Sequence, residues 1–214
     1  EWFLNDATIL TANASNYTAT EIGNYSLIAT NIATGCQSTK VSATVKRAYA
    51  SENFIPYLTN TFTDNATLTV IVEGGTGPFL IQLDGGLFES NNIFTNLSPG
   101  THVIKVTDIN SCTDLTKEII ILDYPKFFTP NNDGYFDTWN IFKLSEQKDA
   151  KVYIYDRYGK LLKQISPSGE GWNGLHNGQQ MPSDDYWFTV DYREMSIQGV
   201  MEWTKFKSHF SMKR

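Results

Sequence analysis

The chain has 214 residues, and its apolar share of 41% and aromatic share of 14% are enough to bury a core, which excludes a disordered protein. Charged residues make up only 19%, the net charge is −6 and no basic cluster exceeds two residues, so we expect no nucleic-acid partner. No apolar run approaches the roughly 18 residues of a spanning helix, so we expect the chain itself not to be membrane-spanning.

The composition changes near residue 123. Up to Leu122 there are 11 acidic residues against 5 Lys or Arg, and 19 of the 23 Thr. From Asp123 onward each sign occurs 12 times, and this part holds 18 of the 29 aromatic residues. The sequence therefore predicts two kinds of domain joined at this point.

An internal repeat organises the first part. Gly23-Asn-Tyr-Ser-Leu-Ile-Ala-Thr-Asn31 and Gly100-Thr-His-Val-Ile-Lys-Val-Thr-Asp108 share a glycine, an alternating pattern and a closing Asx residue, with an offset of 77 residues. A period of this length favours a small sandwich of about seven strands over a solenoid. Alternation predicts the core-facing side chains of both strands: Tyr25, Leu27, Ala29, His102, Ile104 and Val106.

The first copy, residues 1–46, is too short for a whole sandwich. Trp2 stands where the buried tryptophan of the third strand would be, so we expect about thirty residues of strands upstream of Glu1. No export leader is present at Glu1, so the leader of an exported protein would already have been removed. We predict that the chain is the C-terminal part of a longer protein.

The second copy, residues 47–122, is predicted to be complete. The turn Asp84-Gly85-Gly86 indicates a tight hairpin between the strands on either side of it. The expected strands are 66–72, 79–83, 93–97, 100–108 and 117–122.

The third region, residues 123–214, is predicted to be another β-sandwich. The turn at Arg157-Tyr158-Gly159 indicates a hairpin, and helical periodicity is absent. The last strand places Thr204, Phe206, Ser208, Phe210 and Met212 on one face and Lys205, Lys207, His209 and Lys213 on the other, so we expect it to close the domain with its end tied down. The expected strands are 125–128, 138–142, 150–156, 160–165, 186–192 and 203–212. The fold class is therefore all-β, with tandem Ig-like β-sandwiches followed by a C-terminal β-sandwich.

Catalytic signatures are not found in this sequence. The histidines have no metal-ligand spacing, and His102 is expected to be structural. Asp184 and Asp185 are adjacent on a strand, point to opposite faces and cannot converge on one bond. We predict no catalytic residues and no enzymatic activity.

The two cysteines, Cys36 and Cys112, occupy equivalent places in the two copies. A bridge between them would have to join separate domains, so we expect each to be a small buried apolar residue. The alternative for Cys36 is a redox partner in the missing upstream strands.

A segment from Thr129 to Asn140 is similar to the middle of a calcium loop. Asn131, Asp133 and Asp137 would offer oxygen ligands, and Gly134 would permit the sharp turn. The match is partial, since Thr129 and Asn140 stand where Asp and a bidentate Glu are wanted. A metal-free Asx turn is at least as well supported, and we expect no other cofactor.

Four tryptophans of the third region pose a binding question. They could form a sugar-stacking platform or fill a thin core, and core packing is favoured for any one of them. They are Trp139, Trp172, Trp187 and Trp203.

Several blocks of the third region resemble a known family in order and content. They are Tyr124-Pro-Lys-Phe-Phe-Thr-Pro-Asn-Asn-Asp-Gly134, Asp137-Thr-Trp-Asn140, Lys151-Val-Tyr-Ile-Tyr-Asp-Arg-Tyr-Gly-Lys-Leu-Leu162, Gly171-Trp-Asn-Gly174, Pro182-Ser-Asp-Asp-Tyr-Trp-Phe188 and Lys207-Ser-His-Phe-Ser-Met-Lys-Arg214. Together they resemble the gliding-motility-associated C-terminal domain, the type B sorting domain of the type IX secretion system. Residues 74–112 resemble the SprB-type repeat of surface adhesins, and residues 1–46 resemble an Ig-like module of the same proteins. The family usually has a small or polar residue where Tyr135-Phe136 stands.

This resemblance implies a sorting signal for an adhesin-like protein at the cell surface, associated with the outer membrane. The implied partners are an outer-membrane barrel of the PorP/SprF class and other translocon components. A terminal strand with an apolar and a basic face could pair with an exposed strand edge or enter a barrel mouth. The expected partner-binding residues are Asn131, Asn132, Asp133, Gly134, Lys207, Phe210, Lys213 and Arg214, and Phe206, Phe210 and Met212 are expected to support folding. The alternative function is a carbohydrate-binding accessory module of an extracellular hydrolase. A third possibility, in which residues 1–122 are spacer modules of an adhesin stalk, is compatible with the sorting-signal function.

Overall fold

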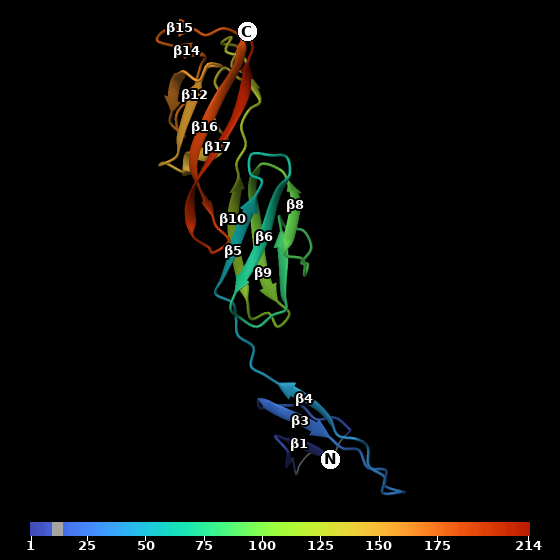
Figure 1. Ribbon diagram of the computed structural model, residues 1–214. Coiled ribbons are helices and arrows are strands. Elements are labelled where there is room, and N and C mark those ends of the chain that lie inside the picture. Colours follow the sequence, from blue (N-terminus) through green and yellow to red (C-terminus); the bar gives the residue numbers. More distant parts are fainter. Residues whose placement is uncertain (10–14) are drawn as a thin grey trace. The chain divides into compact units, whose positions relative to one another are not determined.

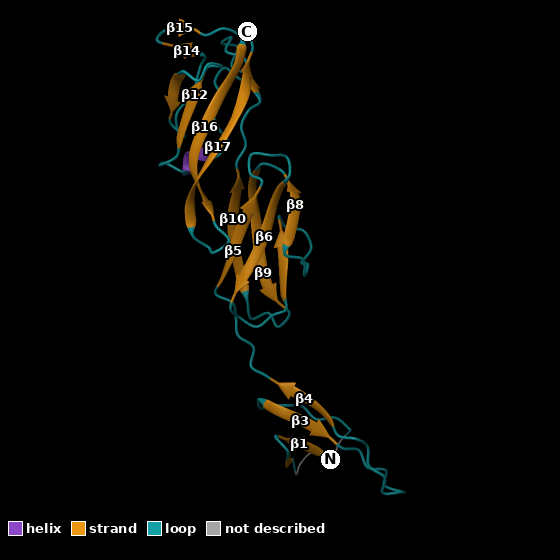
Figure 2. Ribbon diagram, in the orientation of Figure 1, coloured by secondary structure: helices purple, strands orange, loops and turns teal. Residues whose placement is uncertain are grey.

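The computed structural model describes residues 1–9 and 15–214, and nearly all of its regular structure is β-strand (Figures 1 and 2). In the described part of the chain the sole helix is the single 3₁₀ turn Leu144–Glu146. The chain divides into two compact units, Glu1–Tyr49 and Ala50–Arg214. The predicted all-β class is confirmed, and the proposed division into 1–46, 47–122 and 123–214 stays a prediction.

The first unit is one antiparallel sheet. Its strands β1 (Trp2–Leu4), β2 (Ala7–Thr8), β3 (Gly23–Leu27) and β4 (Val41–Val45) pair in the order β2-β1-β3-β4. Tyr25 is buried, Leu27 is half-buried and Ala29 is exposed, so the predicted alternation holds only at the start of the strand. The ring of Tyr17 lies 5.9 Å from those of both Trp2 and Tyr25, which gives this unit a small aromatic cluster.

The second unit begins with two three-stranded sheets. One has the order β5-β6-β8 and the other β10-β9-β7. The strands are β5 (Asn53–Thr59), β6 (Ala66–Glu73), β7 (Phe79–Leu83), β8 (Ile93–Leu97), β9 (Gly100–Asp108) and β10 (Asp114–Ile121). The inward faces of both sheets supply one core: Phe54, Leu68, Val70, Ile81, Ile104, Val106 and Ile119. The predicted inward face of β9, which includes His102, is confirmed.

Two features of this sandwich differ from the sequence-based expectation. Strand β5 was missed because Pro56 lies in its middle, where it pairs with Val70 at the edge of the sheet, a position that tolerates proline. The tight hairpin at Asp84-Gly85-Gly86 is wrong as predicted. The chain makes only one bridge there, between Ile81 and Glu89, and β8 then crosses to pair with β6.

The last part of the second unit is built on one five-stranded sheet with the order β11-β17-β16-β12-β13. Strands β16 and β17 form a long antiparallel hairpin that pairs throughout both strands, and β11 runs parallel to the end of β17. The strands are β11 (Phe127–Phe128), β12 (Lys151–Tyr155), β13 (Leu161–Ile165), β14 (Leu175–His176), β15 (Gln179–Gln180), β16 (Asp184–Met195) and β17 (Met201–Met212). The strand predicted at 138–142 is reduced to two bridges, Trp139 with Trp172 and Asp123 with Phe142.

The core of this sheet is aromatic. Trp139 and Trp172, which come from the irregular segments outside the sheet, are 0% and 1% exposed. The ring of Phe210 stacks on that of Trp139 at 4.0 Å, and Tyr186 meets Trp172 edge-on at 4.9 Å. Irregular backbone therefore forms the second layer, and large rings fill the space between this layer and the sheet.

The prediction that the cysteines are buried is wrong. Cys36 and Cys112 are both exposed free thiols. Cys112 lies in the turn after β9, whose buried residues are Asp108 and Thr113, and Asp108 accepts hydrogen bonds from the N–H groups of Cys112 and Thr113. The carboxylate that organises the turn occupies the interior, so the thiol remains outside.

Candidate functional site

The terminal strand β17 has the two faces that the sequence predicts. Phe210 and Met212 are each 1% exposed, whereas Lys205, Lys207 and His209 are exposed. Phe210 was also expected at the partner contact. Its burial against Trp139 removes it from the surface, so the structure assigns Phe210 to folding.

The chain end is held in place, as expected. The N–H of Lys213 donates to the carbonyl of Phe128 at 3.1 Å, and the N–H of Arg214 donates to Ser183 Oγ at 3.1 Å. The Arg214 guanidinium also donates to the carbonyl of Gly174 at 3.3 Å. Gly174 has φ +78°, and a Cβ there would lie 2.6 Å from Met212 Sδ, so this close approach requires glycine. The terminal residues thus have a defined position.

The loop of residues 129–137 is organised around two carboxylates. Asp137 Oδ1 accepts from the N–H groups of Asn131 (3.0 Å) and Asn132 (2.6 Å), and its Oδ2 accepts from Gly134 (2.8 Å). Asp133 accepts from the N–H of Tyr135 and from the Asn131 side-chain amide, each at 2.8 Å. These hydrogen bonds, that from Tyr135 foremost, hold the pKa of Asp133 below its usual value.

The same contacts bear on the calcium prediction. Every carboxylate oxygen of Asp133 and Asp137 already accepts an N–H hydrogen, which is the metal-free Asx arrangement. A bound cation would have to replace these amide donors. Within residues 1–9 and 15–214 no three His, Cys, Asp or Glu side chains are grouped as metal ligands. The loop thus has the hydrogen bonds of an Asx turn, and calcium binding by Asn131, Asp133 and Asp137 stays a prediction.

The loop and the chain end lie together. The ring of Phe136 is 5.8 Å from that of Phe127, and Lys213 Nζ lies 5.3 Å from the Phe127 ring centroid. Phe127 is 44% exposed and Phe136 56% exposed. We call Phe127, Phe136 and Lys213, with the loop 131–134, the terminal patch. Exposed aromatic rings beside a cation are typical of protein-binding surfaces.

Part of this patch coincides with the predicted contact residues. Residues 131–134, Lys213 and Arg214 lie at one end of the domain, and their role in binding a partner stays a prediction. Phe127 was assigned only to a strand, and Phe136 was noted only as a departure from the family pattern. The signal that could have found them is the density of rings around the loop, Phe127, Phe128, Tyr135 and Phe136.

Lys207 is separate from the terminal patch. Its ammonium lies 5.4 Å from the centroid of the Trp187 ring, in the middle of the β16–β17 hairpin. Lys213 lies six positions further along the chain, about 20 Å away at the rise of an extended strand. The predicted contact residues therefore form two groups.

One edge of β17 is open along most of its length. The N–H groups of Ser211 and Lys213 point to the β11 side, where they donate to Lys126 and Phe128. Because successive residues of an antiparallel strand face opposite neighbours, Lys205, Lys207 and His209 direct their main-chain groups to this same side. No strand among the described residues pairs with them there. This open edge is available for an added strand.

Phe62, from the β5–β6 loop, lies inside the core of the C-terminal sheet. It is 3% exposed, stacks on Phe206 at 4.4 Å and meets Tyr192 edge-on at 5.3 Å. Its φ of +63° is strained for a bulky residue, so the surrounding packing must stabilise this conformation. Beside it, Thr61 Oγ1 donates to Glu194 Oε1 at 2.6 Å. The sandwich of β5–β10 thus completes the core of the following sheet.

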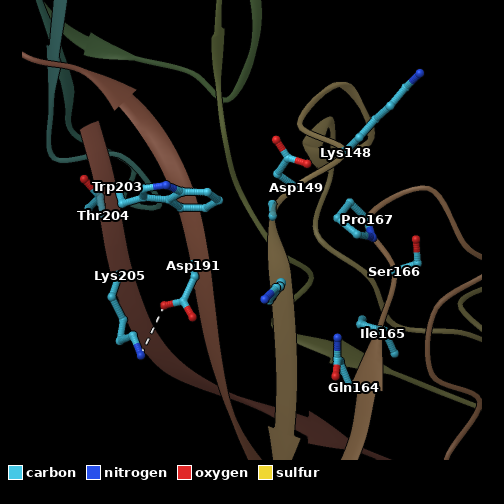
Figure 3. Close-up of a pocket in the computed structure, with 12 residues that line it drawn as sticks. Lys148, Asp149, Gln164, Ile165, Ser166, Pro167, Asp191, Trp203, Thr204 and Lys205 are labelled. Carbon is cyan, nitrogen blue, oxygen red and sulfur yellow. Dashed lines mark ion pairs between the residues drawn. The ribbon is translucent and has the colours of Figure 1, made fainter. Parts of the chain in front are cut away.

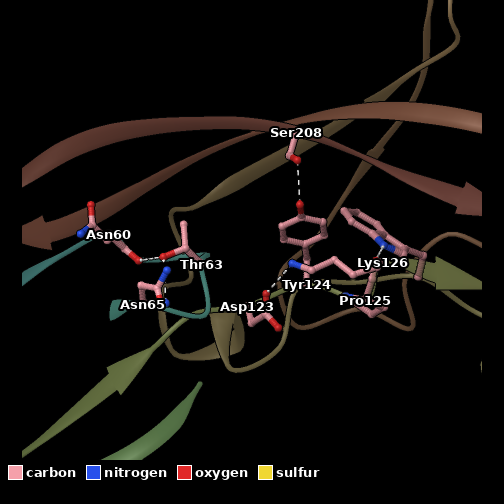
Figure 4. A network of polar contacts seen from close by, with 9 residues as sticks. Asn60, Thr63, Asn65, Asp123, Tyr124, Pro125, Lys126 and Ser208 are labelled. Atoms are coloured by element: carbon pink, nitrogen blue, oxygen red, sulfur yellow. Dashed lines mark hydrogen bonds and ion pairs between the residues drawn. The ribbon is translucent and has the colours of Figure 1, made fainter. Parts of the chain in front are cut away.

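The segment that joins these two parts is fixed as well. Figure 4 shows Tyr124 reaching Ser208 of β17, and their hydroxyl oxygens are 2.7 Å apart. Trp139 Nε1 donates to the carbonyl of Pro125 at 2.7 Å, and Lys126 pairs with Asp123 at 3.0 Å. Burial raises the pKa of the neighbouring Tyr192 hydroxyl, which keeps it neutral. From Leu122 onward the connecting segment is therefore held against the C-terminal sheet by buried side chains and hydrogen bonds.

Comparison with known proteins matches residues 122–204 to the family described as CHU_C Type IX secretion signal domain. No curated protein matches the chain. Among solved structures, the chicken CNTN1 FN1-FN3 domains show 12% identity and a TM-score of 0.26, covering 90% of this chain and 78% of that one. The BSP domain of a biofilm associated protein shows 13% identity and a TM-score of 0.22, covering 78% and 28%.

The matched residues begin at the packed connection and extend into β17. They include the loop 129–137, the buried Trp139 and Trp172, the whole of β16 and the first four residues of β17. In the described part of the chain no helix has the length and apolar character needed to cross a membrane. Residues 122–204 are therefore similar to a type IX secretion signal domain, and this similarity supports export of the protein to the cell surface or the extracellular space.

Proposed function

We propose that this chain is the C-terminal part of a large adhesin-like surface protein. In this proposal residues 123–214 are read by the type IX translocon and then retained by an outer-membrane barrel of the PorP/SprF class. The single observation that carries the proposal is the family match over residues 122–204. The proposal contains no catalytic step.

Two surfaces support recognition by a partner. The terminal patch combines exposed rings with a cation and a loop of fixed shape, and aromatic residues dominate the energetics of many protein interfaces. The open edge of β17 offers unpaired main-chain groups, which is the requirement for β-strand addition. We propose that the partner binds the terminal patch first, because its loop and chain end are already ordered.

A reporter fusion tests the export role. A periplasmic fluorescent protein followed by residues 50–214 is expected to reach the cell surface of a host with a working type IX system and to stay in the periplasm of a translocon mutant. Surface fluorescence with and without external protease gives the measurement. A fusion that stays inside cells with a working exporter would contradict the proposal.

The terminal patch is tested by a paired variant. Phe136→Ala with Lys213→Gln should lower surface display by about tenfold, because a ring and a cation are removed from the interface. Lys160→Gln, an exposed lysine in the β12–β13 turn, is the matched control and should leave display unchanged. Equal loss in both variants would exclude the patch as the contact.

The alternative of a carbohydrate-binding module required a sugar-stacking platform of four exposed tryptophans. Two of the four are buried in the core and cannot contact a sugar. Trp139 and Trp172 are buried, whereas Trp187 and Trp203 are 40% and 55% exposed. We therefore do not propose an accessory module of a hydrolase as the function of this domain.

A further inference from the structure

The C-terminal sheet carries a groove away from the terminal patch and the open edge. Its volume is about 1050 Å³, and it is lined by residues of β12, β13, β16 and β17 and by the segments next to β12 and β13. Figure 3 shows Trp203, Lys205 and Asp191 on one side of the groove and Gln164 to Pro167 on the other. The volume is comparable to that of small-molecule binding sites, which reach about 1,000 Å³.

Trp203 provides an apolar surface in this groove. Its side chain is exposed, and the guanidinium carbon of Arg193 lies 4.9 Å from the ring centroid. Arg193 thereby fixes the orientation of the indole without removing it from solvent. An exposed and oriented indole is a suitable surface for the C–H face of a pyranose ring, which is flat and apolar while the ring's hydroxyl groups point outward.

The charges of the groove are unequal after pairing. Asp191 Oδ1 pairs with Lys205 Nζ at 3.2 Å, and Asp149 Oδ2 pairs with Arg193 at 3.7 Å. Lys148 and Lys151, which also line the groove, have no carboxylate within ion-pair distance among residues 1–9 and 15–214. Both carboxylates are thus paired while two lysines remain unpaired, which favours an anionic ligand.

We propose that this groove binds an acidic polysaccharide through successive pyranose rings that bear carboxylates. One ring stacks on Trp203, the carboxylate of a neighbouring ring pairs with Lys151, and hydroxyl groups along the polymer exchange hydrogen bonds with Asp191 and Gln164. The site is independent of export, because it shares no residue with the terminal patch. It would let the exported domain hold a uronate-containing glycan at the cell surface.

Calorimetric titration of the purified 214-residue chain with hexagalacturonate tests the proposal, and cellohexaose is the neutral probe. We expect hexagalacturonate to bind at least about tenfold more tightly than cellohexaose, with an affinity that falls as salt is raised, because the charge pair is exposed. No binding of hexagalacturonate, or equal binding of the neutral chain, would overturn the proposal. Vesicles that carry an acidic lipopolysaccharide form a second arm, which distinguishes an envelope glycan from a free polymer.

Two tryptophan variants locate the site. Trp203→Ala should weaken hexagalacturonate binding at least about tenfold, and Trp203→Phe should restore part of it, because a smaller ring still stacks. Trp187→Ala is the matched control, since Trp187 is also exposed and also lies beside a cation, Lys207, but is not part of the groove. Lys151→Gln should weaken the binding of hexagalacturonate and leave the residual binding of cellohexaose unchanged. Equal losses from Trp187→Ala and Trp203→Ala would overturn the assignment to the groove.

Discussion

The sandwich of β5–β10 and the sheet domain that follows it solve the same packing problem with different side chains. In the sandwich two sheets face each other, and mostly aliphatic residues of moderate size fill the space, such as Leu68, Ile104 and Val106. In the C-terminal domain one sheet faces irregular backbone, and Trp139, Trp172 and Phe210 fill the space. A sheet that lacks a partner sheet requires larger side chains, because irregular segments cannot interdigitate at regular intervals.

The largest expected effect tests the aromatic core. Phe210→Ala should reduce the free energy of unfolding by about 3–5 kcal/mol, because it removes the ring stacked on Trp139 and leaves a cavity. Urea denaturation of the 50–214 unit followed by circular dichroism gives the measurement. Ile104→Ala is the comparison in the aliphatic core, with an expected loss of about 2–5 kcal/mol. A loss below about 1 kcal/mol for Phe210→Ala would contradict the role assigned to the ring.

The next largest effect on stability concerns Phe62, whose ring lies in the core of the C-terminal sheet although the residue belongs to the preceding sandwich. Phe62→Ala should reduce the stability of the C-terminal domain by about 3 kcal/mol, although residue 62 belongs to the preceding sandwich, because its ring fills the space beside Phe206 and Tyr192. The single unfolding transition of the 50–214 unit should separate into two. Phe88→Ala is the control, since Phe88 is 44% exposed in the same sandwich and should change stability by less than about 0.5 kcal/mol. A retained single transition with unchanged midpoint would show that the two regions do not share a core.

A smaller effect on stability depends on pH and concerns the pair His102 and Asp84 in the sandwich of β5–β10. Burial acts to lower the pKa of His102, but its hydrogen bonds to Asp84 (2.7 Å) and the Ser98 carbonyl (2.8 Å) outweigh burial and raise the pKa above the usual 6.5. Burial acts to raise the pKa of Asp84, but hydrogen bonds from His102 and the Val103 N–H outweigh it and lower the pKa.

The pair therefore contributes fully between about pH 4 and pH 6.5. Its contribution is lost as pH rises through the raised pKa of His102, and also as pH falls through the lowered pKa of Asp84. His102→Gln should remove about 1 kcal/mol at pH 6 and less at pH 8, since the half-exposed Asp84 is screened by solvent. Denaturant midpoints across this range give the measurement, with the exposed His209→Gln as control. An equal loss at both pH values would exclude the ion pair as the cause.

The smallest expected effect is local. Asp137→Ala removes the acceptor of three main-chain N–H groups, so hydrogen exchange of Asn131, Asn132 and Gly134 should accelerate while global stability falls by about 1 kcal/mol or less. Millimolar calcium should not slow exchange in the wild-type loop, because amide donors already occupy the carboxylates. Protection by calcium would instead favour the cation site.

The difference between the two regions also explains what could be predicted from the sequence. Alternating strands such as β6, β9 and β17 were found because one face of each is buried and the pattern has a period of two. The segment 138–142 was expected as a strand because it is rich in apolar residues. It lies in the irregular layer, where burial of Trp139 and Ile141 requires no strand pairing beyond single bridges.

The features that could not be predicted from the sequence depend on contacts between residues far apart in the chain. Nothing near Phe62 in the sequence indicates that its ring enters another core, since Tyr192 and Phe206 are more than a hundred residues away. The loop 131–134 and the chain end could each be singled out, but their proximity follows from the parallel pairing of β11 with β17. Pairing between distant short strands leaves no periodic signal in the sequence.

The exposed lysines next to the open edge of β17 also affect contacts between copies of this chain. If two such edges paired antiparallel about Lys207, the two Lys207 side chains would face each other, and like charges opposite one another oppose such pairing. A strand with acidic side chains at alternate positions would meet no such repulsion. The same residues that discourage dimers and fibrils therefore select the charge of any foreign strand that joins the sheet.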